Sequence, residues 1–233
     1  MPQSTYGKRY PLYCCIFLLL FITLLGINPV YRFDWMLETI LTVIFIAFLI
    51  VSYKRFRLSN LSYTLITIFL TLHTIGSHYT YAEVPLGFWL QTVFGFARNH
   101  YDRIVHFSFG LLMAYPVREV FFRIANARGF WGVYLPLDVT LSLSAVYEII
   151  EWLTVVVVNP TAGAAFLGTQ GDEFDPIKDM ALAGIGAAIA MMVTCAINLL
   201  YKPGYRQEWK KSIAVKNTSP LGEVAISKWT KKD

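Results

Sequence analysis

Acidic and imidazole side chains inside apolar stretches are the residues of this sequence that could do chemistry. Asp102 and His106 stand four residues apart in YDRIVHF, so a helix there places both side chains on one face, one turn apart. Such a pair could share a metal ion, or the carboxylate could orient the imidazole as a general base. An Asp–His hydrogen bond that stabilises a helix start would use the same spacing. Both interpretations stay open.

A pair of glutamates lies well inside a second apolar stretch. Glu148 and Glu151, in YEIIEW, are three residues apart and share a helix face. An acid near the centre of a membrane-spanning helix costs about 2.5–3.5 kcal/mol on insertion scales. The pair therefore requires a bound cation, protons, or ion pairs with Arg103 or Lys178. In each case the carboxylates are expected to face the interior of a helix bundle.

A third acidic group precedes the last long apolar run. Asp172, Glu173, Asp175 and Asp179 lie in GDEFDPIKD, and Asp175 and Asp179 are again four residues apart at a helix start. The stretch lacks the D-x-D-x-D-G register of an EF-hand, which excludes that calcium motif. Carboxylates at the mouth of a spanning segment indicate a functional site.

These groups are expected to meet in one pocket, because the helices that carry them reach the same side of the membrane in the topology that the basic residues indicate. Oxygen ligands with an imidazole suit manganese, magnesium, calcium or zinc better than copper. A divalent metal is therefore the cofactor that the residues would accommodate. The candidate metal ligands are Asp102, His106, Glu148, Glu151, Asp175 and Asp179, and the candidate catalytic residues are Asp102, His106 and Glu151.

Further side chains near this pocket could bind a substrate. Arg103 and Lys178 would contact an anionic headgroup through charge-assisted hydrogen bonds. His78 is expected at the outer end of its helix, and Asp172 lies in the acidic loop. The substrate-binding candidates are therefore Arg103, Lys178, His78 and Asp172.

The composition indicates that membrane helices position these residues. Hydrophobic residues make up 56% of the 233 residues and charged residues only 15%, against about 25% charged residues in soluble domains. The net charge of +5 comes from basic residues between apolar runs, where topology requires them, so it does not indicate nucleic-acid binding.

Six apolar runs approach or exceed the length of about 18 residues that marks a spanning helix. We expect an all-α polytopic membrane helix bundle, a single transmembrane domain over residues 1–205, followed by a polar, basic cytoplasmic tail over 206–233 with no fold of its own. A loop containing Pro85 and Trp89 is expected between the third and fourth helices. The six transmembrane helices are expected at about 12–27, 35–53, 61–78, 101–122, 133–158 and 179–201.

The basic residues set the orientation of the bundle. Six spans place both termini on one side, and that side holds all but four of the 20 Lys and Arg residues. The exceptions are Arg32, Arg98, Arg103 and Lys178. By the positive-inside rule both termini are cytoplasmic, and the acidic pocket opens toward the outer leaflet.

Four sequence blocks carry a family resemblance: HTIGSHYTYAEVP, YDRIVHFSFGLLMAYPVRE, YEIIEW and GTQGDEFDPIKDM. They resemble the signature blocks of the YjdF-like bacterial inner-membrane proteins, a family defined by a domain of unknown function. The resemblance covers about residues 10–201. It implies a multi-pass protein of the bacterial inner (cytoplasmic) membrane and leaves the activity open.

A weaker resemblance links the chain to VanZ-like membrane proteins. These have a D-x-x-x-H-F start to one helix, an acid in a later helix, and a D-x-x-x-N-x-x-G helix after a polar loop. Asp102, His106, Glu148 and Asp179 occupy comparable places, whereas Ala183 stands where the asparagine would fall. By analogy of fold, this resemblance implies a role at the cell envelope.

Three classes of function stay open from the sequence. The first is a metal-binding membrane protein, acting as an enzyme on a lipid or envelope precursor in the outer leaflet. The second is a proton- or cation-coupled transporter, for which a homo-oligomer could supply a missing half. The third is a structural or regulatory membrane protein with internally paired charges. In every class the lipid bilayer is the expected partner.

Overall fold

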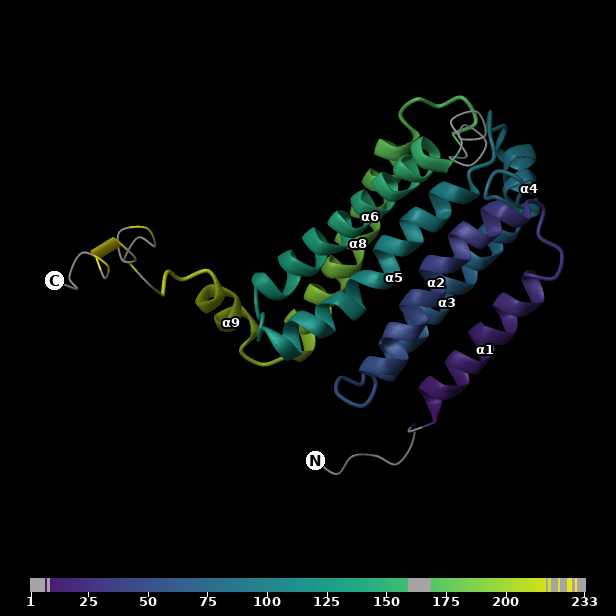
Figure 1. The fold of residues 1–233 in the computed structure, drawn as a ribbon. Helices are drawn as coiled ribbons and strands as arrows, with labels where there is room; N and C mark the ends of the chain where they lie inside the picture. The colour runs from purple at the N-terminus through teal and green to yellow at the C-terminus, as the bar shows by residue number, and fades with distance from the viewer. Residues whose placement is uncertain are drawn as a thin grey trace.

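The computed structural model describes residues 7, 9–158 and 169–216, together with 218, 222, 226, 227 and 229, and the regular structure in this part is helical. Long helices run side by side in alternating directions, with α4 and α9 at opposite ends of the bundle (Figure 1). The predicted all-α class is confirmed. The helices are α1 (Tyr10–Leu25), α2 (Arg32–Ser52), α3 (Asn60–His78), α4 (Pro85–Phe94), α5 (Tyr101–Ile124), α6 (Trp131–Val158), α8 (Asp175–Tyr201) and α9 (Tyr205–Ser212).

Among the described residues, α2, α6 and α8 are long and apolar enough to cross a membrane, and α1 is a shorter apolar helix. Polar residues lower the hydropathy of α3 and α5. In α3 the hydroxyls of Thr67, Thr71 and Thr74 donate to the carbonyl four residues earlier. These bonds satisfy the hydroxyls within the helix, so they can be buried without an unpaired donor. The six-span topology stays a prediction.

Two helix starts differ from the prediction, and a proline explains each. Pro85 opens α4 inside a stretch that was predicted as a loop. Helix α8 begins at Asp175, ahead of the predicted start at Asp179, with Pro176 in its first turn. A proline fits the first turn of a helix because the amide hydrogen that it lacks would have no helical partner there.

The chain after α8 folds further than predicted. Helix α9 docks on the start of α6, where the Phe130 amide donates to Ser212 Oγ at 2.9 Å and Trp131 Nε1 donates to the Ser212 carbonyl at 2.8 Å. Tyr205, the first residue of α9, is buried. The expectation of a tail without a fold is therefore wrong for this segment. Most of the tail after residue 216 lies outside the described residues.

Helices α1, α2 and α3 pack on one another through a cluster of buried aliphatic side chains. The cluster includes Leu18 and Ile22 of α1, Ile46 of α2, and Ile66 and Leu70 of α3. Helix α3 also packs against α5, and it thereby joins this part of the bundle to α5, α6 and α8.

The backbones of α5 and α8 come into direct contact. A Cβ atom on Gly110 would lie 1.8 Å from the Ala183 carbonyl oxygen, and one on Gly186 would lie 2.3 Å from the Phe107 carbonyl oxygen. Only glycine fits at both positions. This is the close approach that small residues permit between membrane helices.

The contact at Gly110 lies one helical turn after His106 on α5 and one turn after Asp179 on α8. His106 precedes Gly110 by four residues on α5, and Asp179 precedes Ala183 by four residues on α8. Side chains one turn above a backbone contact are held within reach of each other. The glycine contact thus positions the two helix faces that carry His106 and Asp179.

The Gly186→Ala substitution is expected to lower the stability of the bundle by about 1–3 kcal/mol, because the added methyl group forces α5 and α8 apart. The control is Gly184→Ala, since a Cβ there would meet only the flexible Leu141 side chain at 3.4 Å. Thermal unfolding of the detergent-purified variants measures the difference. Equal unfolding temperatures for the two variants would contradict the backbone contact.

Candidate functional site

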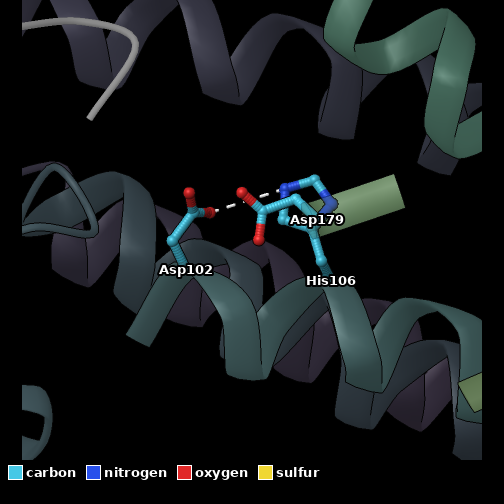
Figure 2. Close-up of side chains that lie close together, drawn as sticks. All are labelled: Asp102, His106 and Asp179. Atoms are coloured by element: carbon cyan, nitrogen blue, oxygen red, sulfur yellow. Dashed lines mark ion pairs between the residues drawn. The ribbon is translucent and has the colours of Figure 1, made fainter. Parts of the chain in front are cut away.

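One carboxylate from α8 joins the carboxylate and imidazole of α5. One ligand atom from each of Asp102, His106 and Asp179 lies within 4.8 Å of the other two. The pair on α5 is separated by 3.5 Å between Asp102 Oδ1 and His106 Nε2. Figure 2 shows the three side chains pointing toward one another. We call these residues the α5–α8 triad.

Two carboxylate oxygens at the triad are buried without a hydrogen-bond partner. Asp179 is 2% exposed, and its Oδ1 accepts no hydrogen bond. Glu148, on α6, places Oε1 3.4 Å from His106 Nε2, and that oxygen also lacks a hydrogen-bond partner. A buried polar atom left unpaired costs about 1–3 kcal/mol, and more when it is charged. These oxygens therefore favour either protonation of the carboxylates or a bound cation.

The donor set fits a divalent cation. Oxygen and imidazole ligands bind such cations at about 2.0–2.2 Å, so ligands on opposite sides of one ion stand about 4 Å apart. The triad atoms need only a small inward movement to reach that geometry. Three carboxylates and one imidazole suit magnesium, manganese or zinc. A cation would also offset the repulsion among the carboxylates of Asp102, Glu148 and Asp179.

Glu151 stands one turn beyond Glu148 on α6 and is half-buried. It is not among the three residues whose ligand atoms converge. Its carboxylate lies near enough to Glu38 and Glu148 for the three groups to repel one another. The structure thus places Glu151 beside the triad.

Asp175 has partners of its own. Arg98 donates to both of its oxygens, at 2.5 Å to Oδ1 and 2.8 Å to Oδ2, and Arg103 donates to Oδ1 at 3.3 Å. The carboxylate is 2% exposed. A guanidinium that binds a carboxylate in a bidentate manner donates to both of its oxygens. Of the six predicted metal ligands, Asp175 is therefore the one that the structure pairs with arginine.

Asp172 accepts hydrogen bonds from two basic side chains at the mouth of the site. Lys178 Nζ and Arg103 Nη2 each donate to Asp172 Oδ2 at 2.6 Å. The Lys178 hydrogen bond is the main reason that the pKa of Asp172 lies below its ordinary value. Arg103 keeps its buried Nε without a hydrogen-bond partner, and Lys178 is 48% exposed at the side chain. Three of the predicted substrate-binding residues thus form one charged group.

His78 lies away from this group. Its Nδ1 is 2.6 Å from the Leu25 carbonyl oxygen at the end of α1, and its own carbonyl accepts from the Val30 amide at 3.0 Å. These bonds tie the end of α3 to the connection between α1 and α2. The structure does not bring His78 to the triad.

Hydrogen bonds join the segment that precedes α5 to the segment that precedes α8, next to the site. The Asn99 amide donates to Gln170 Oε1, and Gln170 Nε2 donates to the Asn99 carbonyl, both at 3.0 Å. Arg98 adds a bond to the Thr169 carbonyl at 2.9 Å. This reciprocal pairing fixes the entry of α5 against the entry of α8, and so fixes the registers of Asp102 and Asp179.

The sequence interpretation missed a second polar group, which reaches the site from α2 and α3. Tyr147 donates to Glu38 Oε2 at 2.6 Å, and His73 Nε2 lies 3.9 Å from the same oxygen. Tyr81 Oη is 2.6 Å from His73 Nδ1. Burial raises the pKa of the Tyr81 hydroxyl well above its ordinary value, so this phenol stays protonated. Glu38 could have been found by its position, since it is an acid inside the apolar run 35–53.

The Asp175→Asn substitution is expected to destabilise the protein by about 3–5 kcal/mol, because it removes the charged carboxylate that accepts two hydrogen bonds from the buried Arg98 guanidinium. The matched control is Glu173→Gln, which removes an exposed acid from the same loop. Thermal unfolding in detergent reads out both variants. An Asp175→Asn protein as stable as the control would show that the Arg98 pair does not hold the loop.

The comparisons with known proteins agree with this architecture. The family model described as predicted membrane protein (DUF2238) matches residues 10–199. Inner membrane protein YjdF of Escherichia coli (strain K12) is 39% identical over 163 residues, which covers 70% of this chain and 78% of that protein. No solved structure matches. The predicted resemblance and the inner-membrane location are confirmed, and the chain belongs to the DUF2238 family of predicted membrane proteins.

Proposed function

We propose that this protein is a divalent-cation-dependent enzyme of the inner membrane that acts on a phosphorylated lipid or envelope precursor in the outer leaflet. The observation that carries the proposal is the α5–α8 triad, with the unpartnered Asp179 Oδ1 and Glu148 Oε1 buried at its centre. Asp102, His106 and Asp179 hold the cation, and Glu148 lies within reach of it.

The chemistry follows from the charges around the triad. A bound divalent cation polarises a phosphoryl oxygen or lowers the pKa of a bound water, and either effect promotes attack at phosphorus. Arg103 and Lys178 stand at the mouth, where a phosphate can exchange with Asp172 for their hydrogen bonds. The residues of the chain thus supply both a cation site and an anion site.

The predicted topology, six spans with cytoplasmic termini, supports a position of this site in the outer leaflet. The start of α1 and the end of α8 lie at the same end of the bundle (Figure 1). The triad lies at the opposite end, near the starts of α5 and α8. The 19 residues of α3 extend about 28 Å, close to the hydrocarbon thickness of about 30 Å. This arrangement supports α3 and α5 as spans despite their polar residues.

A transporter is less well supported by the same features. The ionisable groups gather at one end of the bundle, and the cavity next to them is lined mainly by apolar side chains, among them Phe45, Phe69, Phe109 and Met113. A relay would need polar groups across the membrane. The geometry therefore favours chemistry at one leaflet.

Purified wild-type protein is expected to retain near-stoichiometric divalent metal after incubation with magnesium, manganese, calcium and zinc followed by desalting. Asp102→Asn and Asp179→Asn should lower the metal content at least about tenfold, since each removes a ligand. Elemental analysis measures the content. Glu83→Gln is the matched control, because it removes an exposed acid in the segment between α3 and α4 without touching the triad.

A thermal unfolding transition close to that of the wild type must show that each variant is folded. Wild-type protein without metal under every loading condition would exclude the cation site. Metal retained by both folded aspartate variants would exclude these ligands.

The topology predicts opposite accessibilities for two engineered cysteines in a background without Cys14, Cys15 and Cys195. Glu83→Cys should react with an impermeant maleimide in intact spheroplasts. Lys216→Cys should react only after lysis, because the end after α9 lies on the cytoplasmic side. Labelling of Lys216→Cys in intact spheroplasts would overturn the six-span orientation.

A further inference from the structure

A cavity of about 330 Å³ lies between α2, α3, α5 and α6, directly beside the triad. This volume falls in the range of about 300–1,000 Å³ typical of ligand pockets. Voids larger than a water molecule are few in protein interiors. The cavity is therefore large enough to hold part of a small molecule. Its apolar walls include Leu41, Phe45, Leu70, Phe109, Met113 and Leu143.

One end of the cavity is polar and belongs to the functional site. His73, Tyr81, His106 and Tyr147 line it together with the apolar walls. His106 is also a member of the triad. A molecule in the cavity would thus place one end at the proposed cation and the rest among aliphatic and aromatic side chains. A membrane lipid has this arrangement, with a polar headgroup at one end and apolar chains at the other.

The cavity reaches the lipid-facing surface along α6. Leu143, Val146 and Ile150 line the cavity and are also 46%, 49% and 38% exposed. The backbones of α2 and α6 hardly approach each other. Between these helices, the Tyr147–Glu38 hydrogen bond spans the gap near the triad. A hydrocarbon chain can therefore enter sideways from the bilayer, beneath this bond.

A buried hydroxyl inside the cavity lacks a partner. Ser144 is 1% exposed, and its Oγ makes no hydrogen bond. Thr140 and Ser142 on the same helix both donate to the carbonyl four residues earlier. Serine in a helix usually satisfies itself in this way. Ser144 Oγ is thus a buried donor without a partner in the wall of the cavity.

We propose that this cavity binds one hydrocarbon chain of a phosphorylated membrane lipid, which enters between α2 and α6 and directs its headgroup to His106. The inference deepens the proposed function, on which it rests, by naming a lipid as the substrate class. The bilayer supplies such chains at the opening itself. A chain in the cavity would contact its apolar walls.

A second cavity in the same bundle provides an internal control. It has about 410 Å³ and lies between α1, α2 and α3, where Leu18, Ile46, Ile66 and Thr67 are among its lining residues. Among the described residues, no carboxylate or imidazole lines it, and its polar groups are those of Arg9, Tyr53, Tyr63 and Thr67. A lipid that binds through hydrophobicity alone would fill both cavities, whereas a lipid selected by the site would require the first.

The test is photo-crosslinking in vesicles of phosphatidylethanolamine and phosphatidylglycerol, with a diazirine in one acyl chain of the phosphatidylglycerol. Peptide mass spectrometry is expected to find label on Thr42 and Ser144, which face the cavity and are buried. Excess unlabelled phosphatidylglycerol should compete for these positions. Label at lipid-facing residues such as Phe48 should not be competed.

Two substitutions fill the cavity from opposite walls. Ser144→Phe and Leu41→Trp should each lower cavity labelling at least about tenfold, which corresponds to about 1.4 kcal/mol of lost binding. Thr67→Phe, which fills the second cavity, should leave that labelling unchanged. Leu41→Trp decides the outcome if Ser144→Phe unfolds, because Leu41 is only half-buried.

Metal content, measured on the same preparations, separates the two proposals. Metal in the wild type with no competable label in the cavity, or with label unchanged in the folded variants, overturns the lipid inference and leaves the cation site. Competable label that the cavity variants remove, in protein without metal, supports the lipid cavity and overturns the proposed enzyme.

Discussion

The contact between the backbones of α5 and α8 is the constraint on which the rest of the site depends. Gly110 and Gly186 allow it, because any Cβ at either position would overlap a carbonyl of the other helix. One turn above the Gly110 contact, His106 and Asp179 face each other. Larger residues at the contact would separate the helices by the width of a methyl group or more, which is enough to move the ligand atoms of the α5–α8 triad apart.

Charge is divided between two layers at this end of the bundle. In the upper layer Arg98, Arg103 and Lys178 are paired with Asp172 and Asp175. In the lower layer Asp102, Glu148 and Asp179 have a single imidazole among them. Because the guanidinium groups pair with acids of the upper layer, the carboxylates of the lower layer remain short of positive charge. A buried set of this kind is stable only with protons or a cation.

Local spacing predicted the parts of the site that lie within one helix. Asp102 with His106, and the inward position of Glu148, follow from the helical repeat and from the cost of an acid in an apolar run. Partners from other helices could not be predicted in this way. Asp175 has the spacing of a metal ligand, but its carboxylate pairs with Arg98, which lies just before α5. Glu38 lies on α2 and accepts a hydrogen bond from Tyr147 on α6. No helical periodicity in the sequence predicts a contact between two separate helices.

The length of α8 has a consequence for the depth at which the protein works. Its 27 residues extend about 40 Å, roughly 10 Å more than the hydrocarbon layer. Asp179 stands about 6 Å from the start of the helix. In a centred bundle this residue lies at the boundary where acyl chains give way to glycerol and phosphate. Under the proposed function, the lipid substrate therefore meets the site at its own natural depth, with its tails still in the bilayer and no need for extraction into water.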